Sequence, residues 1–410
     1  MRFAKVWQQL LGLECAVVEG VVFDEDEGVI VASVRPRKGA TRRCGTCGRR
    51  CPWEDRGEGR RRWRALDLGF VPAYLEADAP RVRCAEHGVI VAQVPWARHR
   101  ARHTSAFEDQ CAWLAAHCSR SAVEELLRVA WRTVGTIVTR VVADAHARHD
   151  PLAGLRRIGI DEVAYKKGHR YLIVVVDHDS GRLVWAAPGR DKKTLNLFFD
   201  ALGKSGCASL REVSADGAGW IADVVHSRCL NAKLIMDNSH VVQWATDALD
   251  EVRREVWNQA RRDVGDKVLA DRLKGCRYAL WKNPEHLTRR QRGKLAWVAH
   301  SNARLYRAYL LKEELRLAIR LKGDEGIRLL AHWLAWASRC QIPAFVELAA
   351  KIRRHRQAIE EAMRSGTSNA LIESTNTKIR VLTRVALGFR SPEALIAMAM
   401  LAVGGCCPEL

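Results

Sequence analysis

The sequence predicts a multidomain α/β protein, and three observations support that fold class. Pairs of potential metal ligands lie near the N-terminus, short β-type segments occupy residues 157–236, and helical patterns dominate from residue 241 onward. The chain of 410 residues is long enough for roughly two to four domains. Hydrophobic residues make up 48% of it, which is typical of a soluble globular protein.

The chain is strongly basic, with 67 Lys and Arg against 47 Asp and Glu and a formal net charge of +20. This balance favours a polyanionic partner, because cationic side chains neutralise phosphates and release counterions. A basic surface that serves only solubility is the alternative. The 13 cysteines, several of them within apolar helical patterns, favour a reducing compartment. We expect no membrane span and no signal peptide, and therefore a cytoplasmic, nucleoid-associated protein.

Residues 1–96 are expected to form an N-terminal domain that begins with a β-hairpin. Residues 17–23 and 29–34 are rich in β-branched side chains and flank the acidic turn 24–28. Two such runs around a turn that contains Gly are typical of a hairpin.

The same domain is expected to contain a zinc site. Cys44 and Cys47 flank a knuckle with Gly, and Cys84 and His87 repeat the two-residue spacing. Two matched pairs can close a tetrahedral Cys3His site, which would be structural because protein ligands fill all four positions. Cys51 is a spare thiol that could replace one ligand, and unconnected buried thiols are the alternative.

Residues 97–150 are expected to form a helix-turn-helix domain. A basic linker over 97–103 precedes a helical segment at 105–117, and a cluster of N-capping residues at 119–121 precedes two further helices. The last helix, from residue 131 to about 144, offers polar side chains to a DNA major groove. These side chains include Arg132, Thr133, Thr136 and Arg140. A plain three-helix linker bundle is the alternative.

Residues 151–240 are expected to form an α/β domain. Its predicted elements are three strands at 157–161, 170–177 and 182–187, a helix at 192–202, a strand at 210–215, a helix at 221–229 and a strand at 233–236. Three antiparallel strands followed by alternating helices and parallel strands is the order of a ribonuclease-H-like domain.

Two acids fall where this topology brings neighbouring strands together. Asp161 lies on the first strand and Asp216 follows the strand 210–215, so their carboxylates are expected to converge at one edge of the sheet. A carboxylate in a sheet buried on both faces is costly unless a cation neutralises it, which predicts a metal site. A turn-forming Asp before Gly is the alternative for Asp216.

The remaining chain is expected to be helical. Residues 241–365 form an α-helical insertion with basic stretches at 289–294 and 353–356, which either contact phosphate or form solvated faces. Its residues Trp333 and Trp336 are expected in the bundle core. Residues 366–410 return to the catalytic core, and there Glu373, Asn376, Thr377 and Arg380 share a helix face. An N-terminal Glu favoured by the helix dipole is the alternative for Glu373.

Together these motifs resemble a DDE transposase of the ISL-three insertion-sequence family, in the right order over nearly the full length. Four stretches carry the resemblance: Cys44/Cys47 with Cys84/His87; Trp131-Arg132-Thr133-Val134; Gly159-Ile160-Asp161-Glu162 with Gly168-His169-Arg170-Tyr171; and Glu373-Ser374-Thr375-Asn376-Thr377-Lys378-Ile379-Arg380 with Ala386-Leu387-Gly388-Phe389-Arg390.

The resemblance implies that Asp161, Asp216 and Glu373 are a catalytic triad that binds Mg²⁺ or Mn²⁺. It implies an accessory role for Asn376 and for His240, although the family usually has an aromatic residue where Ser239 stands. The second finger pair of the family is more often cysteine at both positions, so His87 departs from the pattern and Cys51 stays a rival ligand. Three carboxylates can hold two divalent cations around one phosphate, while a separate Zn²⁺ is structural.

The expected partner is double-stranded DNA, both the terminal inverted repeats of the element and the target. Because two ends are cut and joined in concert, a homodimer or higher assembly on DNA is expected. The residues expected to contact DNA are Arg60, Arg61, Arg62, Arg64, Arg132, Thr133, Thr136, Arg140, Lys166, Lys167, His169, Arg170, Lys378 and Arg380.

Three other functions stay open on the sequence alone. The chain could be a catalytically inactive zinc-finger and helix-turn-helix regulator, against which the presence of all three acids argues. It could be a recombinase that attacks through tyrosine, but none of its six Tyr lies in a persuasive Arg- and His-rich helical context. It could also be a structure-selective nuclease on the same fold.

Overall fold

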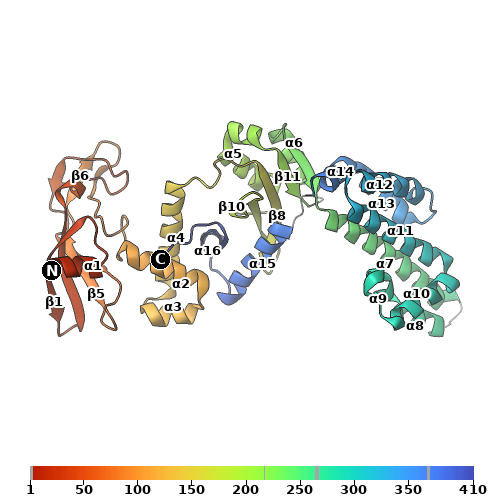
Figure 1. Ribbon diagram of the computed structural model, residues 1–410, viewed down its shortest axis with the longest axis horizontal. Helices are drawn as coiled ribbons and strands as arrows, with labels where there is room; N and C mark the ends of the chain where they lie inside the picture. Colours follow the sequence, from red (N-terminus) through yellow and green to blue (C-terminus); the bar gives the residue numbers. More distant parts are fainter. Residues whose placement is uncertain (1–2, 217, 264–266, 367–369) are drawn as a thin grey trace. The chain divides into compact units, whose positions relative to one another are not determined.

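A computed structural model describes residues 3–216, 218–263, 267–366 and 370–410 of the chain (Figure 1). The chain divides into two compact units, which are described separately below. The first unit comprises Met1–His149 and Arg384–Leu410, and the second comprises Asp150–Thr383.

The first unit begins with helix α1 (Phe3–Leu10) and a four-stranded sheet of order β1-β2-β5-β4. Strands β1 (Ala16–Asp24) and β2 (Val29–Pro36) pair antiparallel, which confirms the predicted hairpin. Gly28 closes its turn with a φ of +64°, a conformation that glycine adopts without steric cost. The other two strands are β4 (Arg60–Arg64) and β5 (Ala73–Asp78).

A second, smaller sheet of order β3-β6-β7 carries two of the predicted metal ligands, Cys84 and His87. It consists of β3 (Trp53–Asp55), β6 (Arg81–Cys84) and β7 (Gly88–Val91), and the 3-10 helix η1 (Lys38–Ala40) precedes it. Strands this short bury little apolar surface, so the sheet needs another source of stability.

Three helices follow, as predicted: α2 (Ser105–His117), α3 (Arg120–Leu127) and α4 (Trp131–Arg148). The hydroxyls of Thr104 and Ser119 cap α2 and α3 by accepting hydrogen bonds from backbone amides. Arg128, at φ +54°, ends α3 and allows the tight turn into α4. The C-terminal helix α16 (Pro392–Val403) packs against α2 and α4. Residues 366–410 were expected to belong with the catalytic core, whereas Arg384–Leu410 lie in this first unit.

The second unit contains a five-stranded mixed sheet of order β10-β9-β8-β11-β12. Strands β8 (Arg157–Lys166), β9 (Arg170–Asp177) and β10 (Leu183–Pro188) pair antiparallel, whereas β11 (Glu212–Ala215) and β12 (Lys233–Met236) run parallel to β8. The predicted strand order is therefore confirmed, with β8 and β11 as neighbours.

Helices α5 (Lys192–Ser209) and α6 (Gly219–Arg228) pack against each other and against this sheet. Phe198 of α5 and Val224 of α6 are buried in one core with Ile158 and Ile173 of the central strands. Val213 of β11 belongs to the same core, which therefore fixes β8, where Asp161 lies, and β11, which Asp216 follows.

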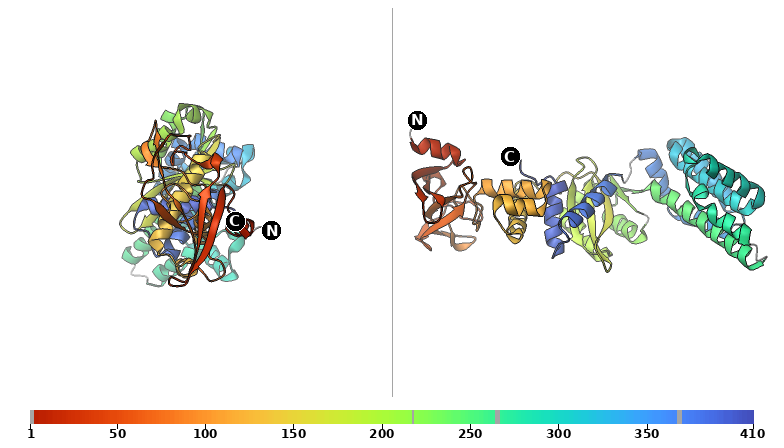
Figure 2. Two further views of the ribbon diagram at one scale, coloured as in Figure 1. Left: turned by 90° about the vertical axis from the view of Figure 1, so that its left-hand side faces the viewer. Right: turned by 90° about the horizontal axis from the view of Figure 1, so that it is seen from below.

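Helices alone fill the described chain between β12 and residue 365, and they form one continuous core (Figures 1 and 2). Trp333 is fully buried and donates a hydrogen bond to the carbonyl of Leu311, and Trp336 packs on the core, so both match the prediction. The elements are α7 (Asn238–Asp263), α8 (Lys267–Gly275), α9 (Arg277–Trp281), η2 (Pro284–His286), α10 (Arg289–Ser301), α11 (Ala303–Leu321), α12 (Gly323–Ala337), α13 (Pro343–Arg354) and α14 (Arg356–Ser365).

The last helix of the second unit, α15 (Ala370–Val385), presents one buried stripe. Ile372, Thr375, Asn376 and Ile379 form this stripe at helical spacing. Over the described residues, no helix is both long enough and apolar enough to cross a lipid bilayer.

Candidate active site and nucleic-acid interface

The four predicted zinc ligands lie together. Cys47 Sγ is 3.7 Å from Cys84 Sγ, and His87 Nδ1 is 3.6 Å from Cys84 Sγ and 3.8 Å from Cys44 Sγ. The ligand atoms of all four residues lie within 4.8 Å of one another. A tetrahedron with Zn–S bonds of about 2.3 Å has edges of about 3.8 Å, so this set fits zinc.

The local fold explains how these ligands meet. Cys44 and Cys47 lie in a tight turn closed by Gly48, whose backbone amide donates to the carbonyl of Cys44. Cys84 ends β6 and His87 precedes β7, which pairs with β6 as a hairpin. The hydrogen bond from His87, together with nearby backbone amides, lowers the pKa of Cys84 to about 6, and this favours the thiolate that binds metal. Cys51 lies outside this four-residue set.

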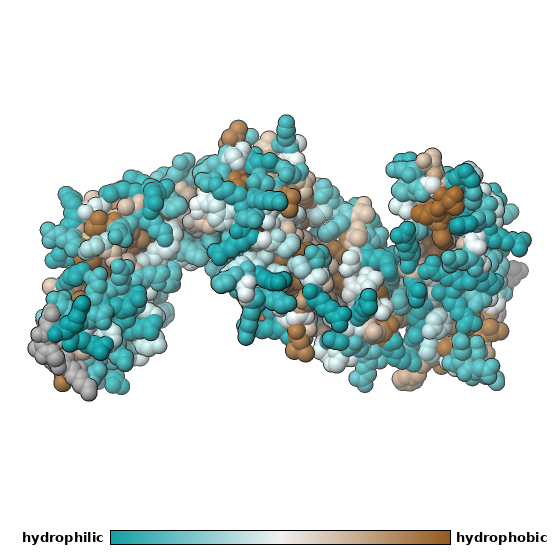
Figure 3. All heavy atoms as spheres, turned by 180° about the vertical axis from the view of Figure 1, so that it is seen from behind, coloured by the Kyte–Doolittle hydropathy of each residue, from teal (hydrophilic) through white to brown (hydrophobic). Residues whose placement is uncertain are grey.

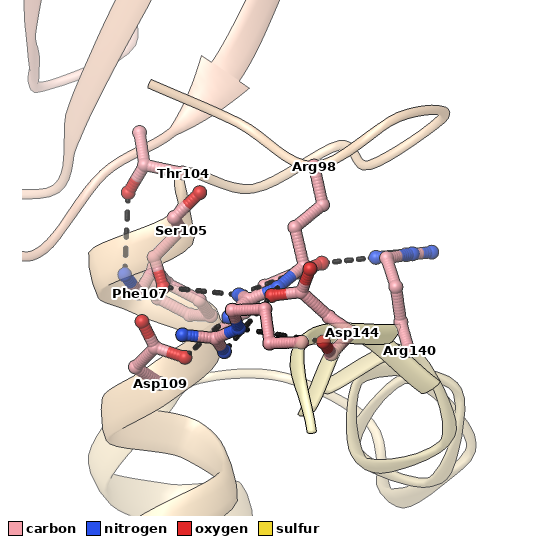
Figure 4. Close-up of polar contacts among 9 residues, drawn as sticks. Arg98, Thr104, Ser105, Phe107, Asp109, Arg140 and Asp144 are labelled. Carbon is pink, nitrogen blue, oxygen red and sulfur yellow. Dashed lines mark hydrogen bonds and ion pairs between the residues drawn. The ribbon is translucent and has the colours of Figure 1, made fainter. Parts of the chain in front are cut away.

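The helix-turn-helix is tied to the preceding linker by a buried ion cluster (Figure 4). Arg98 donates to Asp109 at 2.7 Å and to Asp144 at 3.0 Å, and it pairs with Glu108, which is fully buried. Burial raises the pKa of Glu108, while Arg140 and Arg98 stabilise its charged form. These ion pairs fix the basic linker, α2 and α4 to one another.

The carboxylates expected to form the metal site lie at one edge of the mixed sheet. In the parallel pairing of β8 and β11, Ile160 lies opposite Ala215, so the next residues, Asp161 and Asp216, are neighbours. The Oδ1 atom of Asp161 accepts from the amide of Glu162 at 2.7 Å. Burial raises the pKa of Asp161, and the nearby charge of Asp216 raises it further. Two adjacent acids of this kind suit a divalent cation.

Helix α15 reaches this edge through Asn376. Its side-chain amide donates to Asp161 Oδ2 at 2.6 Å, and its own Oδ1 is buried without a hydrogen-bond partner in the described part of the chain. Glu373, one turn earlier on α15, is exposed. Asp161, Asp216 and Glu373 are not gathered within the 4.8 Å that unites the zinc ligands. The oxygen donors present nevertheless fit Mg²⁺: two neighbouring carboxylates and an unpartnered buried carbonyl.

Comparisons with known proteins identify the family of this chain. A family model described as "Transposase" matches residues 158–399, and a "Helix-turn-helix domain of transposase family ISL3" matches residues 92–142. A third model, "zinc-finger of transposase IS204/IS1001/IS1096/IS1165", matches residues 40–87. The chain belongs to the transposase family ISL3.

Two relatives of this transposase illustrate the similarity. The "Transposase for insertion sequence element IS1557" of Mycobacterium tuberculosis is 57% identical over 433 residues, which cover 100% of this chain and 98% of that protein. The "Transposase for insertion sequence element IS1001" of Bordetella parapertussis is 26% identical over 392 residues, 95% of each chain.

Several arginines of the transposase that were expected to contact DNA have partners within the protein. Arg60 and Arg62 both donate to Glu76, at 2.7 and 2.8 Å. Arg61 donates to the carbonyl of Ala101 at 2.7 Å, Arg64 pairs with Asp67, and Arg140 pairs with Glu108. Part of their charge is therefore neutralised, whereas Arg132 and Thr136 on α4 are exposed.

The basic turn at residues 166–170 was expected to contact DNA, and it lies farther from Asp161 than expected. Strand β8 continues to Lys166, because Val163 is buried in the sheet and the pairing with β9 extends to Arg170. Five residues of strand span about 17 Å. Lys167 and His169 are thus at the tip of a hairpin.

Sequence reasoning missed a third acid at the same edge of the transposase sheet. Met236 of β12 pairs with Ala215 of β11, so Asp237 follows in line with Asp216, and it is 6% exposed. Its Oδ1 accepts from the amide of Ser239 at 3.1 Å, and its Oδ2 is 4.0 Å from His240 Nε2. A short apolar strand ending in Asp, the pattern that identified Asp216, also marks Asp237.

Proposed function

We propose that this transposase binds the terminal inverted repeats of an insertion sequence and catalyses metal-dependent strand cleavage and strand transfer. Asp161, Asp216 and Glu373 are the proposed metal ligands. The observation that carries the proposal is the pairing of β8 with β11, which makes Asp161 and Asp216 neighbours. The hydrogen bond between Asn376 and Asp161 adds to it, because it brings the helix of Glu373 to the same edge.

The sheet order supports a ribonuclease-H-like catalytic core. Three antiparallel strands followed by two parallel strands is the arrangement expected of that fold, and α7–α14 would then be a helical insertion between β12 and α15. Without such a cation site, the neighbouring charges of Asp161 and Asp216 would only destabilise this edge.

Each residue has a distinct role in the proposed reaction. Divalent cations held by Asp161, Asp216 and Glu373 would activate water or a DNA 3′-hydroxyl and stabilise the leaving 3′-oxygen. Asn376 fixes the orientation of Asp161 through its 2.6 Å hydrogen bond. Glu373 is exposed on the first turn of α15, so we expect a small movement of this side chain to complete the site. Burial raises the pKa of Asp161, and the charges of His240 and Arg380 offset part of this increase and so favour its charged form.

The zinc finger and the helix-turn-helix are the proposed readers of the inverted repeats. The exposed Arg132 and Thr136 of α4 are placed for base and backbone contacts, while the structural Zn²⁺ holds the finger. Lys166, Lys167, His169, Arg170, Lys378 and Arg380 are proposed to contact DNA phosphates. Target DNA would bind at the catalytic edge, and two chains would act on the paired ends.

Carboxamide variants test the triad. Asp161→Asn, Asp216→Asn and Glu373→Gln should each abolish Mg²⁺-dependent cleavage of a duplex that carries a terminal repeat, while binding of that duplex survives. Glu347→Gln, which changes an exposed acid of α13, is the matched control and should cleave normally. Retained cleavage by all three triad variants would refute the assignment. The same assay separates a transposase from an inactive regulator, which would bind but never nick.

A further inference from the structure

The positive charge of the helical segment 241–365 is concentrated in one part of it. The whole segment has 26 Lys and Arg against 15 Asp and Glu. Residues 267–294, which span α8, α9, η2 and the start of α10, contain 9 of these cations and only 2 of the acids. The other residues of the segment contain 17 Lys and Arg and 13 Asp and Glu, so their charges are nearly balanced.

Packing brings together the helices α8, α9 and α10, on which these cations lie. Lys294 Nζ donates to the carbonyl of Gly275 at 2.7 Å, which ties α10 to the end of α8. Arg272 lies 5.8 Å from the ring centre of Trp297, and Arg277 stacks 3.9 Å above Trp281. We define the α8–α10 surface by six exposed cations: Arg272, Lys274, Arg277, Lys282, Arg289 and Arg290. In Figure 3 this end of the helical segment, at the lower left, is predominantly hydrophilic.

The cations of this surface differ from other arginines of the same segment in lacking acidic partners. Arg304 pairs with Glu255 at 2.7 Å, and Arg316 pairs with Glu285 at 3.0 Å and with Glu313 at 2.8 Å. Among the side chains that the structure describes, none of the six cations of the α8–α10 surface lies within 4.0 Å of a carboxylate. Unpaired like charges repel one another, and a bound polyanion would relieve that repulsion.

The first turn of α10 is unfavourable for its own helix. Arg289 and Arg290 occupy the first two positions of α10, and its first turn has no acid. Cations at a helix N-terminus oppose the macrodipole, and the capping box of Thr288 and Gln291 has to stabilise this end instead. The first backbone amides of α10 and the guanidinium groups of Arg289 and Arg290 are therefore at the same exposed helix end. Such an arrangement suits the binding of phosphate.

Helix α7 sets the distance of this surface from the carboxylate edge. It begins at Asn238, directly after Asp237, and its 26 residues span about 39 Å. Helices α8 and α9 both pack against α7, and Arg253, whose charge acts on the Cys276 thiol between them, is roughly 22 Å from the start of α7. The α8–α10 surface is thus about 22–39 Å from the carboxylates, a distance of about seven to eleven base pairs.

We propose that the α8–α10 surface binds the phosphate backbone of duplex DNA about seven to eleven base pairs from the cleaved phosphodiester. This inference rests on the proposed function for the position of cleavage. Flexible Lys and Arg side chains on an exposed surface contact phosphates without reading bases, so this binding is independent of sequence. It would hold the DNA in line with the carboxylate edge.

The test compares Arg289→Ala/Arg290→Ala with the control Arg328→Ala/Arg339→Ala, which removes two exposed cations that do not belong to the α8–α10 surface. Binding is measured without divalent cations, on terminal-repeat duplexes that extend about five or about twenty base pairs beyond the cleavage position on either side. On the longer duplexes, the surface variant should reduce the slope of log affinity against log salt by about 1 to 2. The control and the charge-preserving Arg289→Lys/Arg290→Lys should behave as wild type.

Phosphate ethylation interference locates the contact on the DNA. Wild type should show interference about seven to eleven base pairs from the cleavage position, and the surface variant should not. An unchanged salt slope and footprint would overturn the proposal, as would altered self-association at unchanged DNA affinity, because the surface would then bind protein. These binding experiments need no cleavage. Their result can therefore be interpreted even if Asp161, Asp216 and Glu373 prove not to be the metal ligands.

Discussion

Asn376 links α15 to the sheet that carries Asp161. Its 2.6 Å hydrogen bond to Asp161 orients a carboxylate whose pKa is raised by burial. We predict that Asn376→Ala lowers the cleavage rate about 10- to 100-fold and raises the Mg²⁺ concentration needed for half-maximal cleavage. Cleavage rates measured over a Mg²⁺ titration test this.

Thr377→Ala is the control for Asn376, because Thr377 is its exposed neighbour on the same helix. It should cleave with the wild-type Mg²⁺ dependence. If Asn376→Ala lowers the rate but leaves the Mg²⁺ dependence unchanged, then Asn376 supports the helix without positioning Asp161.

His103 makes the first unit sensitive to acid. Burial and the charges of Arg140, Arg64 and Arg102 lower its pKa to about 4, from an ordinary value of 6.5. Between these values the unfolded chain binds a proton that the folded chain does not bind. The free energy of unfolding is therefore expected to fall as the pH is lowered from about 6.5 to 4.

His103→Phe separates this effect from other acid-sensitive groups. Phenylalanine keeps the stacking of His103 on Phe107, whose ring centres are 4.9 Å apart, and removes the titration. In urea unfolding with excess Zn²⁺, the variant should lose less stability than wild type over that pH range. Parallel losses in the two proteins would contradict this role of His103.

At the scale of elements, local patterns predicted the β1–β2 hairpin and the strands of the mixed sheet, whereas the five strands β3 to β7 were not predicted. The turn with Gly28 and the β-branched runs around it predicted the first hairpin, and the range of β9 was predicted in full. Strand β8 was predicted too short, because the prediction ended it at the carboxylate of Asp161, whereas residues 162–164 and Lys166 also pair with β9. Pairing with a neighbouring strand is not visible in the strand's own sequence.

The candidate site was predictable in part for the same reason. The neighbouring positions of Asp161 and Asp216 follow from strand order, which the sequence pattern contains. The hydrogen bond of Asn376 to Asp161 joins residues 215 positions apart, and no local signal specifies it. Nor could the pattern predict that Arg140 pairs with Glu108, since their contact depends on how α2 and α4 pack.

The zinc finger gives a prediction at the scale of one element. The sheet β3-β6-β7 is small, so bound metal should supply most of its stability. Cys47→Ser should lose the bound zinc and release this sheet to rapid amide hydrogen exchange. Cys51→Ser should keep one zinc per chain and normal exchange, because Cys51 lies outside the four-residue set. Zinc loss in the Cys51 variant would show that this thiol is a ligand.

At the scale of the whole molecule, the chain passes from the first unit to the second and returns. Residues up to His149 and from Arg384 onward make up the first unit, which contains the zinc ligands and the helix-turn-helix. Residues 150–383 contain the carboxylate edge and the α8–α10 surface. The proposed function therefore places end recognition and catalysis in different units of one chain, and variants of either should be separable in binding and cleavage assays.

The last prediction concerns the number of chains that act on a pair of ends. If two chains assemble symmetrically and each cuts one end, an equal mixture of wild type and Asp161→Asn contains about one quarter fully active dimers. Cleavage at both ends of one DNA should then fall to about one quarter, with products cut at a single end accumulating. If one chain cuts both ends by itself, double cleavage should fall only to about one half. Quantifying the two products on a DNA with paired ends decides between these mechanisms, because the mixture changes neither the fold nor the affinity of either chain for DNA.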